Sequence, residues 1–180
     1  MNKIFVVLIL LTNIICFSQE KYKKVEKGKC KVEHTCRLET YNDPFEETIN
    51  YRIGFFETSL IKASEGTVTY TLDRRIDKNK NSKIYMAIFG RATGCRDKDS
   101  FVYFLFKNGE KLKINTMFNS IDCGTSVIGI ILNDENLNLL LNNEIDKIRL
   151  QYSDASEDFV VSEKGQKKLF GNLKCISSIE

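Results

Sequence analysis

The 180-residue sequence contains one histidine, His34, one proline, Pro44, and no tryptophan. A serine or cysteine nucleophile needs a histidine base beside it, and nothing in the sequence places a hydroxyl or a free thiolate next to His34. Gly-x-Ser-x-Gly, phosphate-loop and dinucleotide-binding glycine motifs are also missing. The lack of tryptophan removes the usual platform for stacking sugars, although tyrosine can take its place. The sequence therefore predicts no catalytic residues and no cofactor.

No Cys-x-x-Cys pair occurs among the six cysteines. Cys30, His34 and Cys36, with Cys175 as a fourth donor, are residue types that bind zinc, but structural zinc sites usually contain closely spaced cysteine pairs. On a strand Cys30 and Cys36 would lie roughly 20 Å apart at ~3.3 Å per residue, and no glycine or proline between them bends the chain. We therefore expect no metal site, and disulfides instead.

Long apolar runs are missing as well, apart from one at the N-terminus. Lys3 precedes an apolar stretch over Ile4–Ile15, which has the length of a signal-peptide core and is too short to span a bilayer comfortably. We interpret residues 1–19 as a signal peptide, cleaved after Ser18 or Gln19. The protein is then exported to the periplasm or the extracellular space, with no transmembrane segment after cleavage.

A lipid-anchored form that starts at Cys16 is the alternative, but Ile15 is bulky where lipidation requires a small residue. The mature chain, residues 20–180, is long enough for one domain with a hydrophobic core. Residues 20–30 are rich in lysine, and we interpret them as a flexible stem. The 27 Lys and Arg residues nearly balance the 24 Asp and Glu residues, so no nucleic-acid partner is expected.

The enriched residue types are β-branched and aromatic, and both favour strands. Gly66–Leu72 alternates apolar residues with threonines, as a half-buried strand does, and "IDKIRLQY" places Ile148, Leu150 and Tyr152 on one face. Continuous apolar runs of strand length predict strands covered on both faces at Lys83–Gly90, Phe101–Phe106 and Thr125–Leu132. Earlier strands are predicted at Lys31–Glu39 and Ile49–Phe56, and an exposed loop at Asp73–Lys83.

Two segments have helical patterns. Asp134 is the expected N-cap of a two-turn helix with leucines at helical spacing. Ser162 is the expected N-cap of a C-terminal helix whose stripe includes Leu169, Leu173 and Ile176. These elements predict a mainly β fold: a single antiparallel β-sandwich or barrel-like domain with a short inserted helix and a C-terminal helix packed on the sheet.

Asn108-Gly109 separates two apolar stretches, which predicts a hairpin with a two-residue type I′ loop. This loop would place Leu105 opposite Leu112 and Tyr103 opposite Ile114. Extending the register brings Cys95 and Cys123 together at the open end of the hairpin, so we expect them to form a disulfide. A second disulfide between Cys36 and Cys175 would join the first strand to the C-terminal helix.

Paired carboxylates would suffice for glycoside hydrolysis. Two acidic clusters occur, Asp43, Glu46 and Glu47 in one turn and Asp154, Glu157 and Asp158 in another. We expect the carboxylates of both clusters to lie in loops and to be solvated. The first cluster also lacks the ligand spacing of calcium loops, and turn formation by Asn42-Asp43-Pro44 explains it.

Several segments follow one another in a recognisable order: a cysteine, "KDSFVYFLFKNGEKLKI", "DCG", "ILNDENLNLLLNNEIDKIRLQY" and "LFGNLKCI". Together with "TYNDPFE" after Cys36 and the "FSQ" signal end, this order resembles a group of exported bacterial proteins, typical of Bacteroidetes, with no assigned activity. The resemblance implies a β-rich exported domain and supplies no catalytic residues.

The sequence thus predicts an exported, non-enzymatic binding or interaction domain. Its partner would be a protein or a cell-surface component. Two alternatives remain open, an extracellular hydrolase that uses the loop carboxylates and a structural envelope protein.

Overall fold

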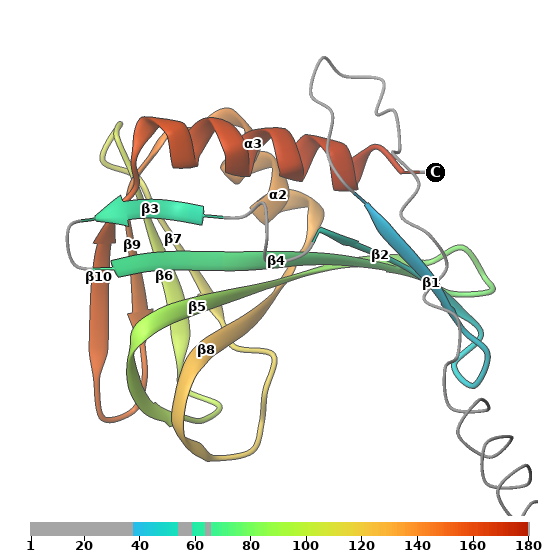
Figure 1. Ribbon diagram of the computed structural model, residues 1–180, viewed down its shortest axis with the longest axis horizontal. Coiled ribbons are helices and arrows are strands. Elements are labelled where there is room, and N and C mark those ends of the chain that lie inside the picture. Colours follow the sequence, from blue (N-terminus) through green and yellow to red (C-terminus); the bar gives the residue numbers. More distant parts are fainter. Residues whose placement is uncertain (1–37, 54–58, 64–65, 180) are drawn as a thin grey trace, which may run out of the picture.

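The computed structural model describes residues 38–53, 59–63 and 66–179, with side chains described for 38–53 and 68–179. These residues form two antiparallel sheets and two helices, packed as a sandwich that does not close into a barrel (Figure 1). The mainly β fold predicted from the sequence is therefore confirmed. The predicted strand at Lys31–Glu39 lies almost entirely outside the described residues, as do the signal peptide and the stem.

Sheet A has the order β1-β2-β4-β5-β8, and β3 also pairs with β4. Its strands are β1 (Glu39–Asp43), β2 (Thr48–Ile53), β3 (Ser59–Ala63), β4 (Gly66–Ile76), β5 (Ser82–Arg96) and β8 (Asp122–Leu132). Sheet B has the order β10-β9-β6-β7. Its strands are β6 (Phe101–Phe106), β7 (Lys111–Asn115), β9 (Ile145–Gln151) and β10 (Ser156–Val160), and the helices are α2 (Asp134–Asn142) and α3 (Glu163–Ser177).

The two sheets enclose one core. Every second residue of β6 and β7 points inward, and these side chains, with the buried residues of β9 and β10, meet those of β4, β5 and β8 in a single apolar cluster. Fully burying one large apolar side chain contributes about 1.5–3 kcal/mol. The inward residues include Val102, Phe104, Phe106, Ile148 and Leu150 from sheet B and Tyr70, Leu72, Met86, Ile88, Ile128 and Ile130 from sheet A.

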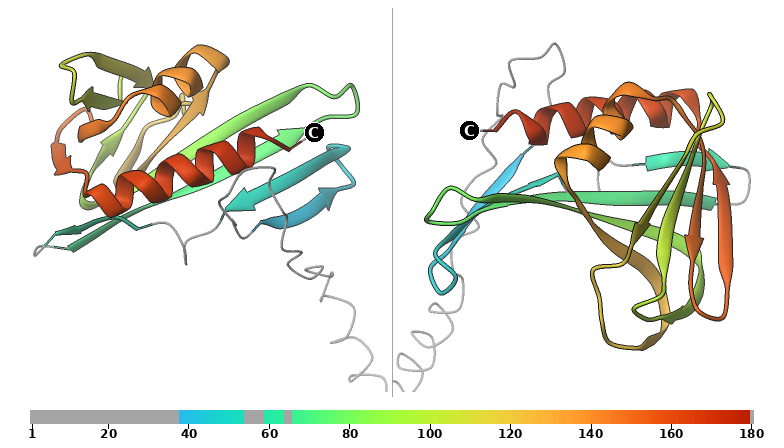
Figure 2. Two further views of the ribbon diagram at one scale, coloured as in Figure 1. Left: turned by 90° about the horizontal axis from the view of Figure 1, so that it is seen from above. Right: turned by 180° about the vertical axis from the view of Figure 1, so that it is seen from behind.

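Helix α3 runs along β3 and β4, as Figure 2 shows from above and from behind. Ser162 caps it as predicted, because the Ser162 side chain accepts a hydrogen bond from the Gly165 N–H. At the other end Arg74 of β4 donates to the carbonyls of Ile176 and Ser177, at 3.1 and 2.7 Å. A cation at the carbonyl end of a helix stabilises it, since those carbonyls lack partners within the helix.

Two local predictions are wrong. Asp73–Lys83 is not one exposed loop, since β4 continues to Ile76 and β5 begins at Ser82. The charged end of β4 is ordered by its partners on neighbouring elements, such as Arg52, whose Nε lies 2.6 Å from an Asp73 oxygen. The N-cap of α2 is Asn133 instead of Asp134, and its side chain accepts from the Asn136 N–H.

The predicted register of the β6–β7 hairpin is wrong by one residue. Leu112 and Ile114 lie opposite Phe104 and Val102, instead of the adjacent Leu105 and Tyr103. The observed register places five apolar side chains, Phe106 included, on the core side and leaves the tyrosine ring half exposed. Burial of the more apolar face thus decides the register.

The hairpin loop has three residues, Lys107, Asn108 and Gly109. The Phe106 N–H donates to the Glu110 carbonyl at 2.9 Å, and the Gly109 N–H donates to the Phe106 carbonyl at 3.0 Å. Gly109 has φ of 87°, a conformation that glycine adopts without strain. Asn-Gly fits this longer loop as well as the two-residue turn.

Of the three apolar strands predicted to be covered on both faces, Thr125–Leu132 comes nearest to this, with Ile128, Gly129 and Ile130 buried in succession. In Phe101–Phe106 and in Lys83–Gly90 the inward residues are buried, whereas the alternate residues are half exposed. Sheet B therefore has an outer face that carries its own set of side chains.

Candidate functional site

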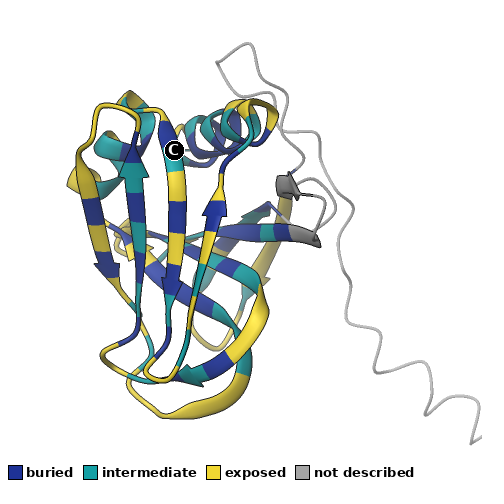
Figure 3. Cartoon of the chain, turned by 90° about the vertical axis from the view of Figure 1, so that its left-hand side faces the viewer, coloured by how far each residue is buried: buried dark blue, intermediate teal, exposed yellow. Residues whose placement is uncertain are grey.

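The outer face of sheet B faces the viewer in Figure 3. On this face, a column of apolar side chains lies between two columns of cations. On β6 these are Phe101, Tyr103 and Leu105, all half exposed. We call this surface the basic face and define it by eight residues: Phe101, Tyr103, Leu105, Lys111, Lys113, Lys147, Arg149 and Asp158.

Strand register sets the rows of the basic face. Tyr103 lies between Lys113 of β7 and Arg149 of β9, and Arg149 lies opposite Asp158 of β10. In the next row Leu105 lies between Lys111 and Lys147. Neighbouring strands are about 4.8 Å apart, so the two columns of cations stand roughly 10 Å apart across β6.

A hollow of about 400 Å³ opens on the basic face, lined by Tyr103, Leu105, Lys111, Lys147, Ile148, Arg149 and Asp158. This volume is within the range of small-ligand sites, which starts at about 300 Å³. An apolar floor with charged side chains around it is suited to a ligand that has both apolar surface and negative charge.

Two cations of the basic face have defined partners. Arg149 forms a two-point hydrogen bond with Asp158, at 2.6 and 2.7 Å. The bond raises the pKa of Arg149 and lowers the pKa of Asp158, so both stay charged at neutral pH. Lys113 Nζ lies 4.0 Å from the centre of the Phe101 ring, a cation–π contact.

The remaining two cations, Lys111 and Lys147, differ from these. Within the part of the chain that the structure describes, neither lysine forms a direct ion pair with a carboxylate, and Lys147 acts on Asp158 only at longer range, where it helps Arg149 to lower the pKa of Asp158. Both line the hollow on opposite sides of Leu105. The basic face as a whole has four cations against one carboxylate and so attracts anions.

The acidic residues before β2 stabilise a turn, as expected. One oxygen of Asp43 accepts from the N–H groups of Phe45 and Glu46, at 2.9 and 3.2 Å. Glu47 pairs with Lys78 of the neighbouring hairpin at 2.8 Å. These carboxylates support the turn between β1 and β2 and do not converge on a shared point.

The second acidic cluster differs from its prediction, because Glu157 and Asp158 lie on β10 and not in a loop. Glu157 is nearly buried, with 9% of its side chain exposed. One of its oxygens accepts from the N–H groups of Arg91 and Ala92, both at 2.9 Å, and the other from Arg91 Nε at 2.8 Å. Glu157 thus fastens β10 to the irregular part of β5.

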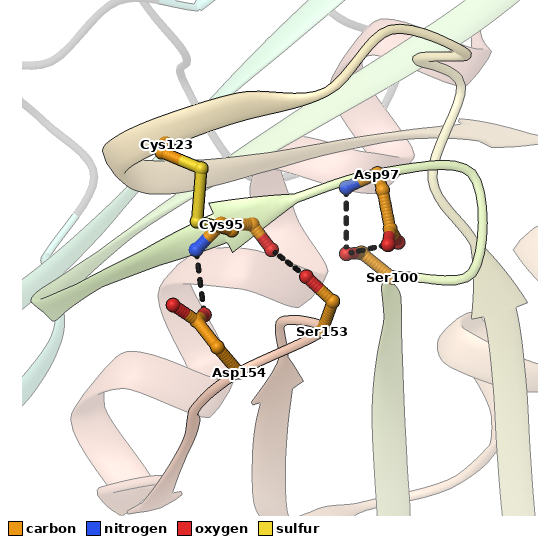
Figure 4. Close-up of a disulfide and its surroundings, with 6 residues drawn as sticks. All are labelled: Cys95, Asp97, Ser100, Cys123, Ser153 and Asp154. Atoms are coloured by element: carbon orange, nitrogen blue, oxygen red, sulfur yellow. Dashed lines mark hydrogen bonds between the residues drawn. A yellow bond between two sulfur atoms is a disulfide. The ribbon is translucent and has the colours of Figure 1, made fainter.

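The expected disulfide between Cys95 and Cys123 is present, with the two Cα atoms 3.9 Å apart. It joins β5 to β8 within sheet A, and these are the strands that precede β6 and follow β7 in the chain. The turn after β9 forms hydrogen bonds with the backbone of Cys95, as Figure 4 shows. There Asp154 accepts from the Cys95 N–H at 2.6 Å, and the Ser153 hydroxyl donates to the Cys95 carbonyl at 2.7 Å.

Cys175 is buried and disulfide-bonded. Cys36, Cys30 and His34 lie outside the described residues, so the pairing of Cys36 with Cys175 stays a prediction. Peptide mapping under non-reducing conditions tests it, and a peptide that joins Cys30 to either cysteine would contradict it.

The described part of the chain holds no group of three or more His, Cys, Asp or Glu side chains placed to bind a metal ion. Neither of the two described helices is long and apolar enough to cross a membrane.

Sequence reasoning did not find the basic face. Its signal was present as lysines and arginine at every second position, in "KLK" (111–113) and "KIR" (147–149). Their convergence depends on β9 and β7 flanking β6, which is set by tertiary structure. Comparison of the chain with protein-family models, with curated proteins and with solved structures gives no match.

Proposed function

We propose that this chain is an exported, non-enzymatic domain that binds a protein or a cell-surface component through the basic face. The observation that carries the proposal is the hollow of that face, with an apolar floor and the unpaired Lys111 and Lys147 on its two sides. A regular sheet fixes the backbone positions from which the charged side chains project, which suits recognition.

Export is supported by two independent features. The N-terminal segment has the charge, apolar length and break of a signal peptide. The disulfide between Cys95 and Cys123 is of the kind that persists in oxidising compartments and is rare in the cytosol.

A hydrolase is the second candidate, and the acidic clusters are its best support. A glycosidase needs one carboxyl that is protonated at working pH. Asp158, the carboxylate on the hollow, has the opposite property, because its bond to Arg149 lowers its pKa. Glu157 and Asp154 each accept hydrogen bonds from β5 backbone groups, which favours structural roles for them.

Binding of labelled mature protein to intact source cells tests the proposal. We expect saturable binding that weakens in the variant Lys111→Gln/Lys147→Gln. The control Lys80→Gln/Lys164→Gln removes the same charge at exposed positions outside the basic face and should bind like the parent. Equal binding by the two variants would refute the role of the basic face.

A panel of hydrolase substrates tests the alternative. Reproducible turnover that disappears on replacing Asp154, Glu157 or Asp158, while the fold is kept, would establish an enzyme and overturn the binding domain.

A further inference from the structure

The chemistry of the basic face narrows the kind of ligand, on the condition that the proposed function holds. The floor of the hollow is formed by Tyr103 and Leu105. A ring and an aliphatic side chain pack well against the CH-rich faces of sugar rings. Phe101 is half exposed as well but does not line the hollow, and Lys113 lies over its ring while Tyr103 contacts it edge-on with ring centres 5.8 Å apart.

The two unpaired cations set the size of the ligand. Lys111 and Lys147 lie on opposite sides of Leu105, two strand spacings or roughly 10 Å apart. A ligand that carries two negative groups on a body covering the apolar floor can pair with both lysines at once and bury Leu105 between them.

The strand pairing disfavours an acidic peptide. Extended peptides are usually recognised through main-chain hydrogen bonds at the edge of a sheet. The hollow is centred on β6 and β9, and each of these strands pairs on both sides, β6 with β7 and β9, and β9 with β6 and β10. The centre of the hollow therefore presents side chains and no strand edge to a ligand, and the edges of the described sheet B are its border strands, β7 and β10.

Single-stranded nucleic acid is disfavoured for a different reason. Its binding surfaces combine a basic groove with several aromatic rings on which successive bases stack. Only one ring of the basic face, that of Tyr103, lines the hollow.

From these observations we infer that the ligand is an acidic polysaccharide, a chain of sugars that carries carboxylate or sulfate groups. One sugar ring packs on Tyr103 and Leu105, and anionic groups on both sides of it meet Lys111 and Lys147. Arg149, held in place by Asp158, adds positive charge beside the ring.

Calorimetric titration of the mature protein at low salt tests this inference. The probes are polygalacturonate, which is carboxylated, heparin, which is sulfated, and neutral dextran. We expect binding of at least one acidic polymer and none of dextran. Lys111→Gln/Lys147→Gln should weaken that binding roughly tenfold, because each substitution removes one exposed ion pair with the polymer. Lys80→Gln/Lys164→Gln should change it less than twofold.

A second pair of variants separates ring packing from charge alone. Tyr103→Phe should retain the affinity for the polysaccharide, and Tyr103→Leu should lower it several-fold with the thermal transition unchanged. Equal affinity of these two variants would overturn the packing role. Binding of polyglutamate or a single-stranded oligonucleotide as tightly as the polysaccharides would overturn the assignment of ligand class.

The two proposals fail in different ways. If binding to cells depends on Lys111 and Lys147 but neither acidic polysaccharide binds, the ligand class is wrong and the proposed function stands. If binding to cells is insensitive to both lysines, both proposals are wrong.

Discussion

Glu157 provides the sharpest test of how β10 is attached to β5. Its carboxylate accepts three hydrogen bonds, two backbone bonds on one oxygen and the Arg91 guanidinium bond on the other. Replacing Glu157 with alanine removes all three. A hydrogen bond to a charged group contributes about 1.5–3 kcal/mol, but water can replace part of it here, because the Arg91 side chain is 29% exposed. We expect Glu157→Ala to lower the free energy of unfolding by about 3–4 kcal/mol.

Glu157→Gln should have a smaller effect, about 1–2 kcal/mol. Its single carbonyl oxygen can retain both backbone bonds, whereas its NH₂ group faces Arg91 Nε and cannot accept from it. Urea denaturation of the mature protein measures both values. For a chain of this size the alanine variant should lose about 10 °C in Tm.

The matched control is Asp158→Asn on the same strand. Asp158 and Arg149 are each about half exposed, so this ion pair should contribute less than about 1 kcal/mol. If Glu157→Ala were no more destabilising than Asp158→Asn, the assigned role of Glu157 would be refuted. An equal loss for glutamine and alanine would show that the backbone bonds contribute nothing.

Three further predictions concern the core and its covalent link. Replacing Cys95 and Cys123 together with serine should lower the free energy of unfolding by about 3–4 kcal/mol, because the bond closes a loop with a sequence separation of 28; a variant as stable as the parent in urea would contradict this. Burial raises the pKa of Tyr152 to about 12, whereas an unfolded tyrosine ionises at about pH 10. The free energy of unfolding should therefore not depend on this group below pH 10 and should fall as the pH rises from 10 to 12, where the unfolded chain loses the proton first. Tyr152→Phe should flatten that part of the stability profile, and an unchanged slope would argue against it. Asn172→Ala leaves the buried Tyr70 hydroxyl without its 2.7 Å partner and should destabilise by about 1–3 kcal/mol; if the reasoning is right, adding Tyr70→Phe restores part of the loss in a double-mutant cycle.

Local sequence pattern was sufficient for most elements of the fold. Period-two alternation in Gly66–Leu72 and the capped stripe after Ser162 predict a strand and a helix from local residues alone, although packing and the bonds from Arg74 then stabilise the helix. Strand β10 was missed because only Phe159 of its five residues is buried, so it has almost no apolar pattern. Strand β3 was also not predicted.

The register error at the β6–β7 hairpin has a different origin. Asn108-Gly109 is compatible with two loop lengths, and the choice depends on whether Phe104 or Tyr103 faces the opposite sheet. That choice depends on packing between the two sheets, which local sequence does not specify. The same holds for the basic face, whose lysines are visible in the sequence although their neighbours are not.

The alternation along β6 and β9 limits how this surface can change over evolutionary time. On both strands, residues of the basic face and residues of the core occupy successive positions, as Tyr103 does beside Phe104 and Arg149 beside Ile148. Inserting or deleting one codon within either strand would exchange the two sets, turning cations inward and core side chains to solvent. New ligand preferences can therefore arise by replacing side chains at a fixed strand length, while changes in length are confined to the turns between strands.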